Sequence, residues 1–399
     1  MLALMTEIMA PDGSPPQTAV TIETVTTVAG VAALRPCYER LQGVTGNLLP
    51  FALHEWHLAW CHHFLNCNPR IRDEPLFYVL RDSAGDCVAI LPFIVSRRRV
   101  GPFKIVSINP LGADPAITEI RSPLIHPGYE RAVARAVQQE LAKIDYWDWV
   151  HWTGISAAFA AALAMGGRLH SQPALSDYVL DMTPTWDEFR GGLKRNIRES
   201  LRHCYNSLKR DNHRFELHVI EDLAGFRSGL DRFLDLHVMR ADYNTAVVHP
   251  NRFASQVARD FLYEVCEGLA KRGALRLFQL KIGSEIVAMR IGFVVGDSLY
   301  LYYSGFDPAW SRYSVMTTTV AETIKYAITQ GLKTVNLSPT PDVSKMRWSP
   351  RQVDYASAYQ HDGRVRSRWA CQAYMRARSG KGLQSWFLRN FNMARHTWR

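Results

Sequence analysis

Two stretches of the chain, about 200 residues apart, repeat the same pattern of apolar and polar positions. Residues 76–95 and 277–295 each consist of an apolar run, a polar turn with a glycine, and a second apolar run. This pattern is typical of a β-hairpin, because such a turn lets two neighbouring strands pair directly. A further strand candidate follows each hairpin, at residues 103–108 and 299–304. The pattern therefore predicts an antiparallel meander in each half of the chain.

Each meander leads into an amphipathic helix and then a short strand. Residues 129–144 and 315–330 have apolar side chains at every third or fourth position, which is the helical period. Short apolar runs follow at residues 147–152 and 334–337. We therefore predict an α+β fold with two similar domains, each a mixed, mainly antiparallel sheet flanked by helices. The alternative is that two unrelated α+β domains share this order by chance.

Further helices are predicted before the second meander. Thr185 and Glu188 have the spacing of a capping box, which opens a helix at Trp186. Three apolar stripes at helical spacing follow, and each predicts a helix. The first consists of Ile197, Leu201, Cys204 and Leu208, and the second of Leu223, Phe226, Leu230, Phe233, Leu234 and His237. The third consists of Phe253, Val257, Phe261, Val265 and Leu269.

Length and composition fit a two-domain globular protein. The 399 residues are 47% hydrophobic and 21% charged, which is enough apolar material for two cores. We expect a flexible tail at 1–20, a first domain at 21–180, a second at 181–360 and a basic aromatic tail at 361–399. The first segment lacks the pattern of a signal peptide, and no run of 18 apolar residues occurs. The seven scattered cysteines indicate reduced thiols in a cytoplasmic protein.

The net charge of +10 lies almost entirely in the C-terminal tail. Residues 363–399 hold nine Lys and Arg and no acidic residue, so the remainder has 38 basic against 37 acidic residues. Aromatic side chains alternate with these arginines. This composition suits contact with an anionic membrane surface or with RNA. We expect the tail to dock on the body or to touch the inner face of the membrane peripherally.

The most informative segment for function is residues 298–348. Its order of strand, turn, basic residue and helix start presents backbone N–H groups to an anion. Ser314 would cap the helix, and Arg312 would pair with a phosphate. The alternative is an ordinary N-cap beside a solvated arginine. We expect the anion to be the pyrophosphate of an acyl-carrying cofactor.

At this point the chain resembles a known family. It is similar to the two-domain GNAT acyltransferases of the cellulose or exopolysaccharide-biosynthesis type, which are related in fold to FemAB peptidyltransferases. The resemblance spans residues 34–359. It rests on the Trp56…Trp60 helix, Ala89-Ile-Leu-Pro92, Ser176-Asp177-Tyr178, Lys194-Arg-Asn-Ile-Arg198, Leu236-His237-x-x-Arg240, Ser304-Gly-Phe-Asp307, Arg312-Tyr-Ser314 and Lys345-x-x-Trp348. The chain departs from the family at Ser314-Val315-Met316, where Ser-Pro-Gly is usual, and at Asn336, where an acidic residue is usual.

The resemblance implies a reaction and a set of site residues. An acyl group would move from a thioester, of coenzyme A or an acyl carrier protein, to an amine acceptor that is a small molecule or is linked to a glycan or lipid. The second domain would carry the acyl site, and the first would be degenerate and help form the acceptor cleft. The expected catalytic residues are Lys345, His237 and Asp342. The expected cofactor-binding residues are Tyr303, Ser304, Arg312, Tyr313, Ser314, Val315 and Met316, and the expected substrate-binding residues are Asp177, Tyr178, Arg198, Arg240, Asp307 and Trp348.

Several of these residues also have ordinary structural interpretations. His237 lies on an apolar stripe and is equally consistent with a packed core histidine, and Asp307 before a proline is typical of a turn. Lys345 would otherwise be a surface lysine. The basic helix face of Lys194, Arg195, Arg198, Arg202, Lys209 and Arg210 would bind an anionic acceptor or carrier protein, or else be solvated. His54, His57, His62 and His63 crowd one helix, but nearby ligands are lacking and we predict no metal site.

Two other functions fit the same sequence. A FemAB-like aminoacyltransferase that uses charged tRNA would explain the basic helix, the basic tail and the missing glycine together. A non-catalytic scaffold at a membrane surface would use the tail alone. Binding of RNA without binding of coenzyme A would favour the tRNA-dependent aminoacyltransferase. A cellular phenotype that does not change when Arg312 and Lys345 are replaced would favour the scaffold.

Overall fold

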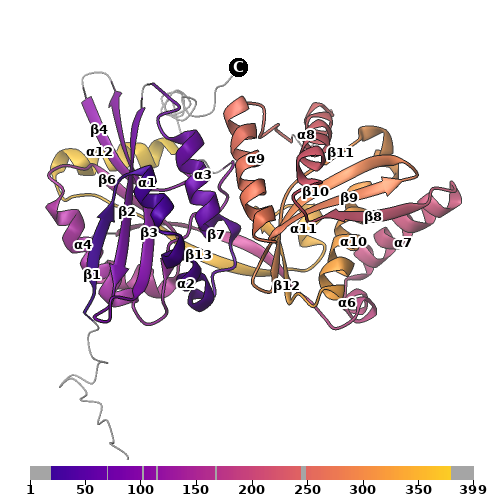
Figure 1. The fold of residues 1–399 in the computed structure, drawn as a ribbon, viewed down its shortest axis with the longest axis horizontal. Helices are drawn as coiled ribbons and strands as arrows, with labels where there is room; N and C mark the ends of the chain where they lie inside the picture. Colours follow the sequence, from indigo (N-terminus) through magenta and orange to yellow (C-terminus); the bar gives the residue numbers. More distant parts are fainter. Residues whose placement is uncertain are drawn as a thin grey trace, which may run out of the picture.

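The computed structural model describes residues 19–69, 71–100, 103–113, 116–166, 169–243 and 249–378. Its described strands form one 13-stranded sheet in the order β1-β2-β3-β4-β6-β13-β7-β12-β11-β10-β9-β8, with β5 paired to β3. Helices pack on this sheet in both halves of the molecule (Figure 1). The predicted α+β class, with a mixed and mainly antiparallel sheet flanked by helices, is confirmed.

The first half holds the first meander. It contains the strands β1 (Thr21–Val25), β2 (Ile71–Arg81), β3 (Cys87–Val100), β4 (Phe103–Pro110), β5 (Leu124–Ile125) and β6 (Trp149–Ile155), the helices α1 (Val28–Ala33), α2 (Arg35–Thr45), α3 (His54–Phe64), α4 (Glu130–Lys143) and α5 (Ala157–Gly166), and the 3-10 turn η1 (Pro50–Ala52).

The second half repeats this order. It contains the helices α6 (Trp186–Gly192), α7 (Arg195–Arg210), α8 (Phe226–Asp242), α9 (Gln256–Lys271), α10 (Val315–Thr329) and α11 (Val343–Met346), the 3-10 turn η2 (Pro308–Tyr313), and the strands β8 (Phe215–Ile220), β9 (Leu275–Ile282), β10 (Glu285–Val295), β11 (Ser298–Phe306) and β12 (Thr334–Pro339). The predicted capping box of α6 is present, with both Thr185–Glu188 hydrogen bonds formed.

Two long strands in the middle of the sheet join the halves. β7 (Leu169–Asp181) pairs with β12, whereas β13 (Arg351–Gln360) pairs with β7 on one side and with β6 on the other. The last strand of the second half therefore completes the sheet of the first half. After it, α12 (Val365–Arg378) packs on β6, where the ring of Tyr374 stacks on Trp149 at 4.6 Å. This docking involves the start of the basic tail, and residues 379–399 lie outside the described part.

Each half contains one parallel strand pair with a short register. In the first half, β4 and β6 pair at Ser107–Trp149 and Ile108–Val150. In the second half, β11 and β12 pair at three positions, which end at Tyr300–Asn336. Both strands continue beyond that point, to Phe306 and Pro339, without pairing to each other. The two strands therefore diverge beyond this point.

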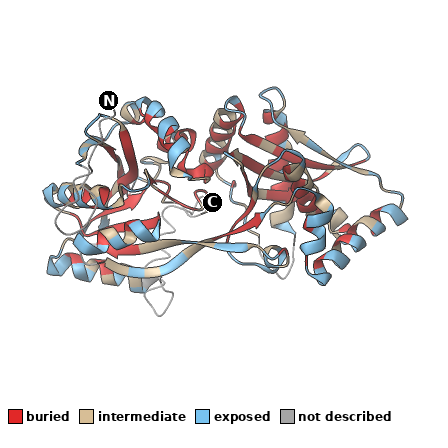
Figure 2. Cartoon of the chain, turned by 90° about the horizontal axis from the view of Figure 1, so that it is seen from below, coloured by how far each residue is buried: buried red, intermediate tan, exposed pale blue. Residues whose placement is uncertain are grey.

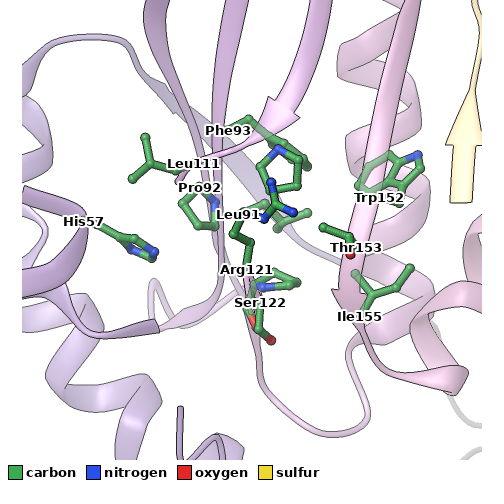
Figure 3. A pocket seen from close by; sticks show the side chains of 12 residues that line it. His57, Leu91, Pro92, Phe93, Leu111, Arg121, Ser122, Trp152, Thr153 and Ile155 are labelled. Carbon is green, nitrogen blue, oxygen red and sulfur yellow. The ribbon is translucent and has the colours of Figure 1, made fainter. Parts of the chain in front are cut away.

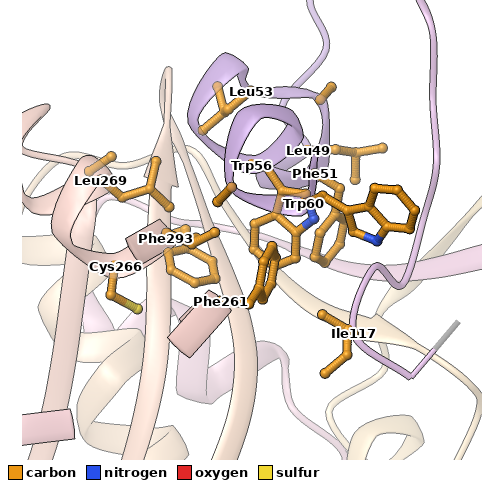
Figure 4. Packing of buried hydrophobic residues seen from close by; sticks show 14 of the residues in the cluster. Leu49, Phe51, Leu53, Trp56, Trp60, Ile117, Phe261, Cys266, Leu269 and Phe293 are labelled. Carbon is orange, nitrogen blue, oxygen red and sulfur yellow. The ribbon is translucent and has the colours of Figure 1, made fainter. Parts of the chain in front are cut away.

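One hydrophobic cluster holds the two halves together. Trp56 of α3 lies at its centre, with its ring 5.3 Å from Phe261 of α9 and 6.1 Å from Phe293 of β10 (Figure 4). Figure 2 shows buried residues along the facing sides of these elements. A buried tryptophan removes roughly 150–250 Å² from water, which contributes about 4–6 kcal/mol. This contact fixes the first half against the strands that carry the site.

The histidines of α3 have partners within the protein. His54 contacts the carbonyl of Val31, and His57 contacts the hydroxyl of Tyr38. His62 and His63 both contact Glu264 of α9 at 2.7 Å, one at each oxygen. Within the described ranges, no group of three or more His, Cys, Asp or Glu side chains is arranged to hold a metal ion. No helix in these ranges has the length and apolarity needed to cross a membrane.

Candidate functional site

A cavity of about 720 Å³ opens where β11 and β12 diverge, next to the N-terminal end of α10. It brings together eight of the predicted site residues. They are Arg240, Ser304, Ser314, Val315, Met316, Asp342, Lys345 and Trp348. Two arginines and a histidine that the sequence analysis did not single out also line it, namely Arg290, Arg347 and His249.

The N-terminal end of α10 is shaped to receive an anion. Ser314 is the N-cap residue, but its φ of 54° and ψ of 42° place it in the left-handed region, and its side chain makes no capping hydrogen bond. Glycine normally occupies this region, so Ser314 adopts the backbone shape that the usual glycine-containing motif provides. Ser314, Val315, Met316 and Thr317 all line the cavity. The first turn of α10 therefore faces the cavity with its positive dipole end.

Arg312 does not line this cavity. Its guanidinium lies over the ring of Tyr313 at 4.7 Å and donates a hydrogen bond to the Tyr313 hydroxyl, which itself donates to Asp211. Arg347 lies at the helix end instead, where its Nη2 donates to Thr317 Oγ1 at 2.5 Å. Burial lowers the pKa of Arg347, so this cation lacks full solvation and favours an anionic partner. The arginine near the helix end is thus Arg347, although Arg312 is nearer in sequence.

Lys345 is bound to a strained turn after β12. Its Nζ lies 3.0 Å from Ser338 Oγ, 2.6 Å from the Pro339 carbonyl and 3.3 Å from the Thr340 carbonyl. Ser338 and Thr340 have φ values of 67° and 74°, which are unfavourable for residues with a Cβ. Burial lowers the pKa of Lys345, and the charge of Glu119 opposes this effect. Lys345 therefore holds the turn in place and adds positive charge to the cavity wall.

Asp342 caps the short helix α11. Its Oδ1 accepts from the Lys345 backbone N–H at 3.0 Å and from the Ser344 hydroxyl. Burial acts to raise the pKa of Asp342, but the hydrogen bonds from Ser344 and Lys345 outweigh it and lower the pKa. This carboxylate is therefore a weak base.

His237 is buried behind β11, with both ring nitrogens engaged. Its Nε2 accepts from the Arg252 N–H at 3.2 Å, so Nδ1 carries the proton and donates to the Ser304 carbonyl at 3.0 Å. Burial lowers the pKa of His237 to about 4. Neither nitrogen is left for proton transfer, and the arrangement is that of a packed core histidine.

A pair of carboxyl groups lies where β11 and β12 begin to separate. Tyr300 donates to Glu119 Oε2 at 2.7 Å, and Asn336 Nδ2 donates to Asp177 Oδ2 at 2.8 Å. Burial raises the pKa of Glu119 to about 7, opposed by the hydrogen bond from Tyr300 and the charges of Lys345 and Arg290. Burial likewise raises the pKa of Asp177 to about 6. Asp177 also supplies, from β7, the acidic group that the family resemblance places at 336.

Glu119 belongs to the first half of the chain, on the segment between β4 and β5. The hydroxyls of Tyr302 and Tyr303 donate to the carbonyls of Ile117 and Ala116 of the same segment, each at 2.6 Å. These bonds fix the segment against β11. Sequence reasoning missed Glu119, because no local pattern indicates that this loop reaches a strand 181 residues away.

The corresponding gap in the first half is filled. Where β4 and β6 diverge, the cavity is only about 10 Å³, and Arg121 and Ser122 are among the residues that line it (Figure 3). Gly154 has a φ of 66°, and a Cβ there would lie 2.1 Å from the Arg121 carbonyl. The loop that places Glu119 in the second half thus also closes the first half's own gap.

The remaining predicted residues lie away from the cavity. Tyr178 is buried in the hydrophobic cluster that also holds Leu201 of α7, whereas Arg198 is exposed on α7. Asp307 accepts from the Ala309 N–H at 2.9 Å and caps η2, which is the turn role. A second cavity, of about 470 Å³, lies between the halves and reaches Asn336.

Comparisons with known proteins agree with this geometry. Residues 195–346 match the family model of the acetyltransferase (GNAT) domain. The matched segment includes α10, the diverging strands and Lys345. No curated protein matches the chain significantly.

Solved structures show the same fold over most of the chain. FemX has 12% identity and a TM-score of 0.54, covering 84% of this chain and 96% of FemX. A conserved protein of unknown function from Bacteroides thetaiotaomicron has 13% identity and a TM-score of 0.50, covering 86% of this chain and 100% of its own. A tandem GNAT protein from the clavulanic acid biosynthesis pathway has 12% identity and a TM-score of 0.44, with coverages of 86% and 100%. FemX and the Bacteroides protein therefore share the fold of this chain over most of its length.

Proposed function

We propose that the protein is an N-acyltransferase that moves an acyl group from a thioester to an amine. The observation that carries this proposal is the cavity between β11 and β12, which continues to the uncapped N-terminal end of α10. An extended thioester arm would lie between the unpaired strand edges, with its phosphates at the first turn of α10 and at Arg347. Coenzyme A and an acyl carrier protein both present such an arm.

The reaction would proceed by direct attack of the amine. The nitrogen forms a bond to the thioester carbonyl, the C–S bond breaks, and the sulfur leaves as a thiolate. The proton lost by the nitrogen passes to Glu119, whose pKa near 7 suits a general base at neutral pH. A backbone N–H in the gap and the positive charge of Lys345 would stabilise the developing oxyanion. The first half would take part in the reaction through Glu119.

A thermal-shift titration with acetyl-CoA, a long-chain acyl-CoA and free coenzyme A tests the proposal. A ligand at 100 times its Kd stabilises the folded state by about 2.7 kcal/mol, which raises the Tm by several degrees. The shift should shrink in Arg347→Gln and remain in Arg312→Gln, because only the first arginine lines the cavity. If no thioester and no acyl carrier protein shifts the Tm, the proposal is wrong.

An aminoacyl-tRNA donor is the second candidate, and the surface of α7 favours it. Arg202, His203 and Arg210 line a shallow depression on this helix, which also carries the exposed Arg195 and Arg198. Such a row would contact an RNA backbone. Salt-sensitive tRNA binding together with no response to coenzyme A would favour this donor. The cellulose or exopolysaccharide type, a carrier-protein partner and membrane contact remain predictions.

A further inference from the structure

Three arginines in the cavity wall form no ion pair with the described residues, and one of them, Arg347, lies at the start of α10. Arg240 comes from α8 and Arg290 from β10, where it lies directly opposite Ser304 of β11. Both line the cavity. The buried Nε atoms of both side chains have no hydrogen-bond partner among the described residues, and neither side chain forms an ion pair there. The cavity thus contains two cations, Arg240 and Arg290, that no described acidic side chain neutralises.

The neighbouring groups orient these arginines without neutralising them. Arg240 Nη1 donates to Ser304 Oγ at 2.8 Å and to the Ser304 carbonyl at 3.2 Å, and its Nη2 faces His249 Nδ1 at 3.0 Å. The carboxylates of Asp342 and Glu119 influence them only from beyond contact distance. Burial lowers the pKa of both arginines, that of Arg290 to about 10. Buried charges are costly unless they are paired, so this arrangement favours an incoming anion.

Arg240 and Arg290 come from other elements than the residues at the α10 end of the cavity, where the phosphates of the donor are proposed to bind. Arg347 and Thr317 mark that end, at α10, whereas Arg240 and Arg290 approach from α8 and β10. Glu119 acts electrostatically on Arg290 and accepts from Tyr300 at the strand divergence. The arginine pair is therefore electrostatically coupled to the proposed base through Arg290.

We infer that Arg240 and Arg290 bind a carboxylate or phosphate carried by the acceptor, so that the acceptor is an amine with an anionic group nearby. Amino acids and aminoalkyl phosphates have this chemistry. Guanidinium groups suit both anions, because their N–H donors match the spacing of the oxygens. The inference rests on the proposed function, since it places the anion beside the attacked thioester. The other source of such an anion is a carboxylate on the acyl group.

The first test measures stability without any substrate. Arg290→Met and Arg240→Met remove an unpaired buried cation, so each should raise the Tm in phosphate-free buffer by a few degrees. Arg276→Met is the matched control, because Arg276 also lies on a central strand but contacts Glu221 at 3.4 Å and Tyr326 at 2.7 Å. That variant should lower the Tm. If Arg290→Met and Arg240→Met lower it as well, the arginines are structural and the inference fails.

The second test measures the response to anions at matched ionic strength. Glycine and O-phosphoethanolamine should raise the wild-type Tm above a sodium chloride control, whereas methylamine and ethanolamine should not. In Arg290→Met the apparent affinity for the anionic amines should fall by about 10-fold to 100-fold, as expected for the loss of one charged hydrogen-bonding group. No response of the wild type to either anionic amine would overturn the inference.

A third comparison distinguishes acceptor from donor and separates the two proposals. If Arg290→Met weakens the binding of succinyl-CoA but leaves the binding of acetyl-CoA and of the anionic amines unchanged, the anion belongs to the donor and our assignment is wrong. If acyl-CoAs shift the Tm and the anionic amines do not, the acyltransferase proposal survives and the acceptor assignment fails. If only the anionic amines shift the Tm, the anion site is supported and the proposal of a thioester donor is wrong.

Discussion

Replacing Glu119 by glutamine tests the proposed base directly. The amide can still accept from the Tyr300 hydroxyl, so the 2.7 Å hydrogen bond is kept while proton uptake is abolished. In the wild type, kcat/KM should rise with pH through an apparent pKa near 7, because the base must be ionised. In Glu119→Gln this rise should disappear, and kcat should fall by about 10²–10⁴-fold with little change in the KM for the thioester.

The same substitution has a calculable effect on stability. The pKa of Glu119 is about 7 in the folded protein against 4.5 for the ordinary side chain. Between these values the folded state binds more protons, so stability is full below pH 4.5 and decreases as pH rises towards 7, by up to about 3 kcal/mol. Glu119→Gln should therefore match the wild type at pH 4 and exceed it at pH 8 by about that amount.

Glu322→Gln is the control for both effects. Glu322 also accepts a tyrosine hydroxyl, that of Tyr205 at 2.6 Å, but it lies on α10 and pairs with Lys325 at 2.8 Å, whereas Glu119 acts electrostatically on Lys345 and Arg290. Kinetics are followed by release of free thiol, and stability by denaturant melts at each pH. If Glu119→Gln keeps the wild-type rate and pH profile, Glu119 is not the base, whatever its effect on stability.

Two further substitutions separate structural residues from reacting ones. His237→Gln should lower stability by about 1–3 kcal/mol through the loss of buried hydrogen bonds, yet change kcat of the remaining folded protein less than tenfold; a loss comparable to that of Glu119→Gln would contradict its structural assignment. Gly305→Ala should destabilise by more than about 3 kcal/mol, because its Cβ would lie 2.4 Å from the His237 backbone nitrogen. Gly191→Ala, which meets nothing within 4 Å, should be close to neutral, and equal melts for the two alanine variants would refute this argument.

The order of elements could be predicted from the sequence because it depends on local periodicity. Both hairpins, both amphipathic helices and the late strands follow from alternating or helical apolar patterns. The start of α10 could also be placed, since a turn and a basic residue precede an apolar helix. The path of β13 could not, because its pairing with β6 depends on contacts about 200 residues apart.

The directions of the side chains at the site could not be predicted from the sequence for the same reason. Arg312 and Arg347 lie close to the start of α10, and only the fold decides that Arg312 turns to Tyr313 while Arg347 turns to Thr317. Glu119 carries no local signal, because its role depends on contact with Tyr300 in the other half of the chain. A site whose residues come from both halves of the chain therefore cannot be recognised from local sequence patterns.

The hydrophobic cluster between the halves should therefore affect catalysis as well as stability. Trp56 Nε1 donates to Thr118 Oγ1 at 3.0 Å, next to Glu119, whereas Trp60 Nε1 on the same helix has no partner among the described residues. Trp56→Phe should cost about 1–3 kcal/mol and also lower kcat by tenfold or more, because a displacement of the base by 1 Å is enough to slow the reaction. Trp60→Phe should lower the Tm through lost packing and leave kcat near the wild-type value. Equal kcat for the two variants, measured at a pH where both are folded, would show that the cluster does not position Glu119.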